Sequence, residues 1–161
     1  MKKLTLTFLI ILFSLTSNVS WSADYNKGLT AYFDGDYVTA LRELKPLAEQ
    51  GHDDAQFFLG RMYDQGYGVI QNYKTAVKWY RLSAEQGDSD AQYNLGLSYY
   101  YGDGVIKDNV YTHMWLNISA SDGYAKASEA RDSIAKTMSS ADISQAQKLA
   151  RECVAKNYKD C

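Results

Sequence analysis

The chain has 161 residues, of which 46% are hydrophobic, 22% charged and 14% aromatic, with a single proline. This composition excludes a disordered or collagen-like chain and indicates one globular or repeat domain. The formal charge is −2; without Lys2 and Lys3, which we expect to be removed, 15 basic residues stand against 19 acidic ones and the charge is −4. This charge gives no excess of basic residues that could bind the phosphates of a nucleic acid, so we expect no nucleic-acid partner.

Residues 1–22 have the pattern of a secretory signal peptide. A charged start precedes an apolar run, residues 4–15, and a short polar stretch. Cleavage after Ser22 would place small residues, Ser20 and Ser22, at the two positions that a signal peptidase inspects, so we expect Ala23 to begin the mature chain. The alternative is an uncleaved anchor, but the apolar run falls short of the ~20 residues that span a bilayer. We therefore predict a periplasmic or fully secreted protein without an integral membrane segment after cleavage.

A 36-residue repeat organises the mature chain. At this offset residues 52–87 align with residues 88–123 without a gap, and the same residue recurs at 14 of the 36 positions. Chance would give roughly two or three identical positions. Gly51, Gly87 and Gly123 mark the ends of the units, and the pattern fades after the last of them, as expected of a terminal unit. The units we predict are residues 24–51, 52–87 and 88–123, followed by a C-terminal cap, residues 124–161, all within a single domain, residues 23–161.

Each unit carries two amphipathic helices joined by a turn. Apolar residues at helical spacing predict a first helix around Leu59 and a second around Tyr80. Two glycines between the helices allow the positive φ angles that an antiparallel helix pair needs at its turn. Small residues are expected where the two helices come closest. The turn glycines and these small residues are the structural positions of the repeat: Gly60, Gly66, Gly68, Ala76 and Ala84 in the second unit and Gly96, Gly102, Gly104 and Ala120 in the third.

The two ends of the repeat have features of their own. Pro46 falls inside the second helix of the first unit, where it should kink or shorten the helix. A final helix is predicted after Ser139 or Ser140, with Ile143 and Leu149 on its apolar face, and we expect it to close the stack.

Both cysteines lie near the C-terminus. An exported protein meets an oxidising compartment, where an even cysteine count usually means pairing, so we predict a Cys153–Cys161 disulfide, with two free buried thiols as the alternative. Disulfide geometry requires Cα atoms about 5.5 Å apart, whereas eight helical steps would separate them by ~12 Å. The final helix must therefore end before Cys161 and the tail must fold back.

The alternation A-x-x-x-L-G-x-x-Y-x-x-G-x-G-V, followed by W-Y/L-x-x-S-A-x-x-G, resembles the Sel-one-like repeat (SLR) family, relatives of tetratricopeptide repeats. The match covers residues 54–123 and is weaker at residues 25–51. Departures are Thr112 for the usual alanine and Asn109 at the position of Tyr73. The resemblance implies an all-α fold, a right-handed α/α solenoid of antiparallel helix pairs with a C-terminal capping helix, which binds proteins or peptides and performs no chemistry.

Residues that could carry chemistry are few. His52 and His113 are the only histidines; the first is explained by a helix start beside acidic residues and the second by the edge of the core. The Gly-x-Gly turns lack the third glycine and the preceding strand of a phosphate loop, and the paired aspartates lack the other ligands of a calcium loop. We therefore predict no catalytic residue, no metal site, no cofactor and no enzymatic activity.

A second stripe on the first helices, opposite Leu59 and Leu95, is the candidate binding surface. First helices line the concave face of helix-pair solenoids, and exposed aromatic and Arg side chains are typical of protein-binding surfaces. As an alternative, Phe57 and Tyr93 pack between neighbouring units. The stripe contains Asp54, Phe57, Arg61, Asp64, Asp90, Tyr93, Leu97 and Tyr100.

These features predict an exported, monomeric interaction module that binds a partner protein or an extended peptide in the cell envelope. One alternative is a cell-wall-associated enzyme or activator of β-lactam-binding type. Ser133 and Lys136 form a Ser-x-x-Lys match, but the companion Ser-Asp-Asn and Lys-Thr-Gly motifs are absent. A further alternative is a secreted effector that acts on a host, which the sequence does not distinguish from the first.

Overall fold

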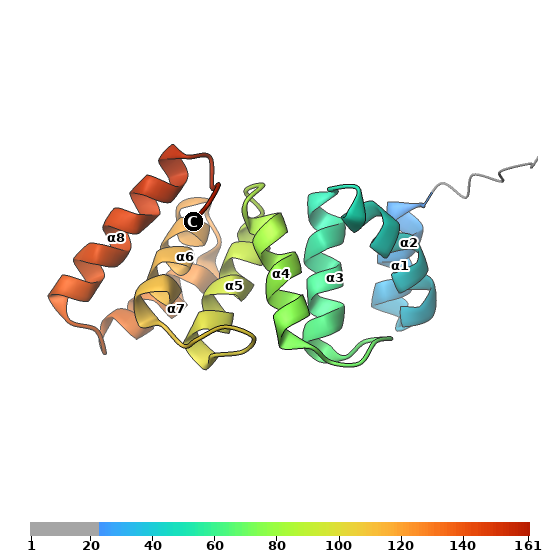
Figure 1. Cartoon of the computed structure of the whole chain (residues 1–161), viewed down its shortest axis with the longest axis horizontal. Coiled ribbons are helices and arrows are strands. Elements are labelled where there is room, and N and C mark those ends of the chain that lie inside the picture. Colours follow the sequence, from blue (N-terminus) through green and yellow to red (C-terminus); the bar gives the residue numbers. More distant parts are fainter. Residues whose placement is uncertain (1–22) are drawn as a thin grey trace, which may run out of the picture.

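The computed structural model describes residues 23–161, so the predicted signal peptide lies outside the described residues. Every regular element in this range is an α-helix, which confirms the predicted all-α solenoid class, and adjacent helices pack pair by pair in a row along the long axis of the molecule (Figure 1). The helices are α1 (Tyr25–Asp34), α2 (Tyr37–Glu49), α3 (Asp53–Gln65), α4 (Tyr73–Ala84), α5 (Ser89–Tyr101), α6 (Asn109–Ser121), α7 (Ala125–Ala135) and α8 (Ser140–Ala155).

Short polar side chains start seven of these helices. Each accepts a hydrogen bond from a backbone N–H of the first turn, which has no partner inside the helix. Tyr124, which precedes α7, makes no such bond. Asn72 and Asp108 stand at the same repeat position, so the repeat itself supplies helix starts at regular intervals. The capping residues are Asp24, Asp36, His52, Asn72, Asp88, Asp108 and Ser139.

The two helices of a pair come closest at a glycine. A Cβ atom at Gly60 would lie 2.7 Å from Cδ1 of Tyr80 and 3.4 Å from the carbonyl oxygen of Ala76. A Cβ atom at Gly96 would lie 3.1 Å from Cγ of Leu116. Because protein interiors are close-packed, the backbone of the first helix can approach this far only without a side chain. Ala76 and Ala84 are fully buried on the facing helix, while Ala120 lies partly buried beside α7.

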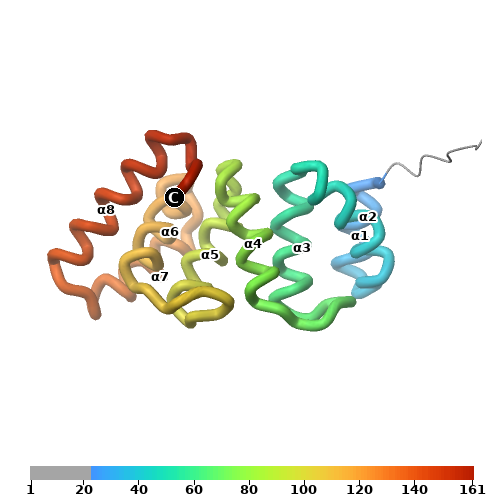
Figure 2. Tube along the Cα trace, in the orientation of Figure 1, coloured from blue at the N-terminus to red at the C-terminus, as the bar shows by residue number. Residues whose placement is uncertain are grey.

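The connections between paired helices, residues 66–72 and 102–108, lie along one edge of the solenoid (Figure 2). Gly68 and Gly104 adopt φ angles of 67° and 74°, which glycine tolerates best. Each also contacts the preceding unit. A Cβ at Gly68 would lie 2.8 Å from Cβ of Tyr37 at the start of α2, and a Cβ at Gly104 would overlap the carbonyl group of Tyr73 at the start of α4. The turns therefore hold successive units together, a role that the sequence pattern did not reveal.

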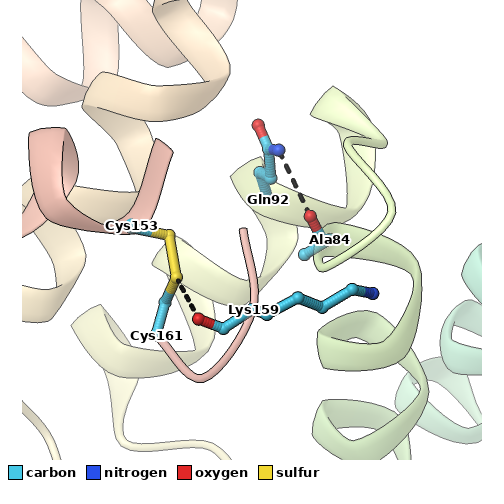
Figure 3. The surroundings of a disulfide bond; sticks show 5 residues. All are labelled: Ala84, Gln92, Cys153, Lys159 and Cys161. Atoms are coloured by element: carbon cyan, nitrogen blue, oxygen red, sulfur yellow. Dashed lines mark hydrogen bonds between the residues drawn. A yellow bond between two sulfur atoms is a disulfide. The ribbon is translucent and has the colours of Figure 1, made fainter. Parts of the chain in front are cut away.

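A buried glutamine repeats at the contact between units. Nε2 of Gln56 donates to the carbonyl oxygen of Ala48 at 3.0 Å, and Nε2 of Gln92 donates to that of Ala84 at 3.3 Å (Figure 3). Both acceptors lie in the last turn of the preceding second helix, where carbonyl groups lack a partner inside the helix. Each carbonyl oxygen also accepts a turn N–H, from Gly51 or Gly87 at 3.1 Å, so the glutamine adds a second hydrogen bond that joins one unit to the next.

The expectation that Pro46 shortens its helix is wrong. Helix α2 runs through Pro46 to Glu49 and has 13 residues, as many as α3. Because Pro46 lies in the last turn of α2, its missing N–H removes a single hydrogen bond close to the helix end.

The C-terminal tail folds back after α8 and closes a disulfide. Cys153 and Cys161 are joined through their Sγ atoms with Cα atoms 5.3 Å apart (Figure 3). The reversal uses left-handed backbone angles at Asn157, Tyr158 and Asp160. The Tyr158 ring contacts the turn at Gly87, where it lies 3.4 Å from the position of a Cβ atom. Since Ala146, Ala150 and Cys153 share a buried cluster with Trp115, α8 and its tail cover the end of the third unit.

Gly60→Ala and Gly96→Ala form a matched pair that tests the close helix contact. Both changes stabilise the helix by the same difference in helix propensity between alanine and glycine, about 1 kcal/mol. Only Gly60→Ala forces a Cβ into a fully buried ring, and such overpacking costs ~1–3 kcal/mol. Thermal unfolding followed by circular dichroism should give a Tm several degrees lower for Gly60→Ala and a much smaller change for Gly96→Ala. A Gly60→Ala protein that melts at or above the wild-type temperature would contradict the packing argument.

Alkylation of the unfolded protein tests the disulfide. Intact-mass measurement should detect two added alkyl groups after reduction and none before it, because both thiols are paired. Reduction should also lower the Tm, by an amount set by the ~3 kcal/mol or less expected for so short a loop. A Cys153→Ala/Cys161→Ala variant serves as the control, since its Tm should not respond to the reductant. Alkyl groups on the unreduced chain would mean free thiols.

Candidate functional site

Three residues of the predicted stripe line one cavity beside α5. They are Tyr93, Leu97 and Tyr100, and the cavity has a volume of about 320 Å³. Its floor is apolar, because Leu116 of α6 and Ile134 of α7 are 1% and 7% exposed. The remaining lining residues are Tyr101, Thr112, Ala130, Ser133 and Thr137.

A second cavity of about 280 Å³ lies on the other side of α5 and faces α3 and α4. It shares Leu97 and Tyr101 with the first cavity, so these two residues form a ridge between the cavities. We call the two cavities and this ridge the α5 groove. The other residues that line the second cavity are Asp64, Gln65, Tyr73, Tyr80, Asn94, Ser98 and Asp103.

Helical spacing explains why α5 serves both cavities. Tyr93, Leu97 and Tyr100 follow one another at intervals of four and three residues and share one face of the helix. Asn94, Ser98 and Tyr101 follow the same intervals one position later, so they lie on the adjoining face. The sequence pattern therefore predicted that Tyr93, Leu97 and Tyr100 share one face of the helix. It did not indicate that neighbouring helices would enclose a cavity beside each of the two faces of α5.

Phe57 is not part of an exposed stripe, which corrects that expectation. The side chain is 7% exposed and lies in the buried cluster with Val77 and Tyr80, with its ring centroid 6.2 Å from that of Tyr80. Arg61 is half-buried, with its guanidinium carbon 5.9 Å from the Phe57 ring centroid. Of the predicted residues on α3, only Asp64 reaches the α5 groove.

Asp54 and Asp90 lie in the first turns of α3 and α5, away from both cavities. They form an acidic edge of the solenoid together with Asp53 and Asp88. The pKa of Asp88 is raised from 3.8 to about 6, mainly by burial and to a smaller extent by the nearby carboxylates of Asp90 and Asp54. The backbone N–H of Ala91, 2.6 Å from Oδ1 of Asp88, has the opposite effect on this pKa. The charged carboxylate is therefore disfavoured at a position that also caps α5.

The two histidines are explained by the fold. Nδ1 of His52 accepts the N–H of Ala55 at 3.4 Å and caps α3, and the His52 ring stacks on that of Tyr25. His52, Asp53 and Asp54 are the one group in the described part of the chain whose ligand atoms lie close enough to hold a metal, within 4.8 Å of one another. His113 is 3% exposed, and burial lowers its pKa.

Sequence reasoning missed the residues that α6 and α7 contribute to the groove. Thr112 and Leu116 belong to the repeat, but their repeat positions indicate only that they face inward. Ala130, Ser133 and Ile134 lie in the segment where the repeat pattern fades, so no equivalent position predicted their place. Tyr101 is 65% exposed and ends the run of three tyrosines. This run was the one sequence feature that could have indicated a role for Tyr101 in the groove.

Stacked helix pairs in a row define a helical-repeat protein. The family model of the Sel1 repeat matches residues 53–88 and 89–124, and each match spans one helix pair, α3–α4 or α5–α6. The chain therefore contains two Sel1-like repeats, as its motif indicated. Proteins of this family are helical-repeat modules that mediate protein interactions, and their fold is generally a non-catalytic scaffold.

Two solved structures resemble the chain. A protective antigen present in uropathogenic Escherichia coli strains, which displays an SLR fold, gives a TM-score of 0.78 at 29% identity, over 83% of this chain and 30% of that one. A Sel1 repeat protein from Oxalobacter formigenes gives a TM-score of 0.65 at 36% identity, over 67% of this chain and 44% of that one. The chain thus spans less than half the length of either structure. No curated protein matches the sequence.

Between residues 23 and 161 no helix is both long enough and apolar enough to cross a bilayer.

The raised pKa of Asp88 predicts a pH dependence of stability. The folded state favours the protonated side chain, so the stabilisation is complete below the ordinary pKa of 3.8 and is lost as the pH rises through about 6. The wild-type Tm should therefore fall between about pH 4 and pH 7 more steeply than that of Asp88→Asn, whose amide can still cap α5 but does not titrate. Equal pH profiles for the two proteins would contradict this assignment.

Proposed function

We propose that the chain is an exported, monomeric interaction module that binds a partner protein or an extended peptide in the cell envelope through the α5 groove. The observation that carries this proposal is the grouping of Tyr93, Leu97 and Tyr100 around one cavity with an apolar floor. Partly exposed aromatic rings beside a pocket are typical of the residues that dominate binding energy at protein interfaces.

Export is supported by two independent features. The first 22 residues have the charged, apolar and small-residue order of a cleavable signal peptide. The Cys153–Cys161 disulfide fits an oxidising compartment such as the periplasm, because disulfides are rare where glutathione keeps thiols reduced.

The lining of the first cavity supports binding rather than catalysis. A nucleophile needs an adjacent base, and the titratable side chains around this cavity are tyrosines. Ser133 lines the cavity, whereas Lys136 follows the end of α7 and does not. Within residues 23–161 the Ser133 hydroxyl makes no hydrogen bond to a lysine, a histidine or a carboxylate. These contacts give no support to an enzyme of β-lactam-binding type.

Photocrosslinking in cells tests the proposal. A photoreactive phenylalanine at Tyr100, which is 37% exposed in the first cavity, should capture one partner protein. The same residue at Phe33, which is 70% exposed at the end of α1, is the matched control and should not capture it. Leu97→Glu should abolish the capture by placing a charge on the ridge, whereas Ile106→Glu, at a side chain 89% exposed outside the groove, should not.

The outcomes separate the alternatives. The crosslinked protein should be recovered in osmotic-shock fluid; recovery in the culture medium would favour a secreted effector. Capture at Phe33 but not at Tyr100, or capture that survives Leu97→Glu, would place the binding surface elsewhere. Capture at neither position would contradict the α5 groove as the contact surface.

A further inference from the structure

The second cavity of the α5 groove carries negative charge without a partner. Asp64 and Asp103 both line it, and no lysine, arginine or histidine lines either cavity. Neither carboxylate forms an ion pair with a basic side chain within residues 23–161. The nearest hydrogen-bond donor to Asp64 is the neutral amide of Gln65. The carboxylates at this cavity are thus available to a cation from outside the chain.

The basic side chains near the groove are already engaged with aromatic rings. Arg61, one turn before Asp64 on α3, holds its guanidinium carbon 5.6 Å from the ring centroid of Tyr32. Nζ of Lys107 lies 5.1 Å from the ring centroid of Tyr100, at the first cavity. A second cation is therefore disfavoured beside Tyr100, whereas two carboxylates and no basic side chain line the second cavity. The two cavities differ in the charge of the side chain that they can accept.

The first cavity fits an uncharged side chain. Its lining contains no carboxylate and no basic group, and its floor is formed by Leu116 and Ile134. Burying an apolar side chain against this floor is favourable, whereas burying a charge without a partner there is costly.

The width of α5 sets the distance between the two subsites. A helix with its side chains is ~10–12 Å across, and the cavities lie on either side of the ridge of Leu97 and Tyr101. An extended chain advances ~3.3 Å per residue and its side chains alternate between two faces, so side chains that enter both cavities stand two or four residues apart.

We propose that the α5 groove binds an extended, cationic segment of a partner protein, with an apolar side chain in the first cavity and a lysine or arginine, two or four residues away, in the second. This inference rests on the proposed function and adds the chemistry of the partner. The formal charge of −4 on residues 23–161 favours the approach of such a segment over the whole surface.

Selection from a displayed library of random peptides tests this proposal. Peptides of about twelve residues are long enough, at ~3.3 Å per residue, to cross both cavities. Sequences enriched on the wild-type protein should pair an apolar residue with Lys or Arg at a spacing of two or four. A selected peptide should bind Asp64→Asn/Asp103→Asn about five- to tenfold more weakly, and its Lys→Gln or Arg→Gln version should bind both proteins equally.

A charge-matched control separates the groove from the overall charge. Asp34→Asn/Glu49→Gln also removes two carboxylates, both exposed and outside the two cavities, and should bind the selected peptide as the wild type does. An equal loss of affinity in this variant would show that the peptide responds to net charge and would overturn the assignment to Asp64 and Asp103.

Leu97→Gln removes the apolar ridge without adding a charge and, checked for folding by circular dichroism, distinguishes the two proposals. Enriched peptides that depend on Leu97 but are acidic, or carry no basic residue, would overturn the cationic partner and leave the α5 groove as a binding surface. No enrichment on the wild type relative to Leu97→Gln would overturn the groove as a peptide site and the proposed function with it.

Discussion

In the pairs α1–α2, α3–α4 and α5–α6 the helices are held at a separation that leaves little room for a side chain at one position of the first helix. The glycine at that position lies against a ring or a branched side chain of the second helix, so a Cβ atom would overlap or crowd the partner. This close approach makes the pair a unit whose outer faces need neighbours to cover them, and units then stack in a row. The facing residues are Gly28 and Leu44, Gly60 and Tyr80, and Gly96 and Leu116.

Stacking then depends on contacts that repeat from unit to unit. Gly68 and Gly104 rest on the start of the preceding second helix, and Gln56 and Gln92 bind carbonyl groups at its end. Each second helix is thus held at both ends by the unit that follows. Each of these contacts joins a unit only to its neighbour. The position of the first helix in one unit therefore determines how much space remains beside the first helix of the next unit.

The α5 groove arises where this space is not filled. Between α1 and α3 aromatic rings occupy the interface, with the ring centroids of Tyr32 and Phe58 5.0 Å apart. Between α5 and α7 the facing residues of α7 include Ala130 and Ser133, whose small side chains leave a cavity over the buried floor. The first cavity is thus a consequence of the departure of the last pair from the repeat pattern, whereas the second cavity lies between two regular units.

The sequence by itself determined the repeat length, the helix pairs, the turn glycines and the type of repeat, because each depends on residues that recur at fixed spacing along the chain. It also placed Tyr93, Leu97 and Tyr100 on one face of a helix. Only the tertiary structure decided that Phe57 is buried while Leu97 lines a groove, and that Asp64 and Asp103 meet at one cavity. The physical reason is that periodicity specifies the face on which a residue lies, whereas the side chains of the neighbouring unit decide whether that face is covered.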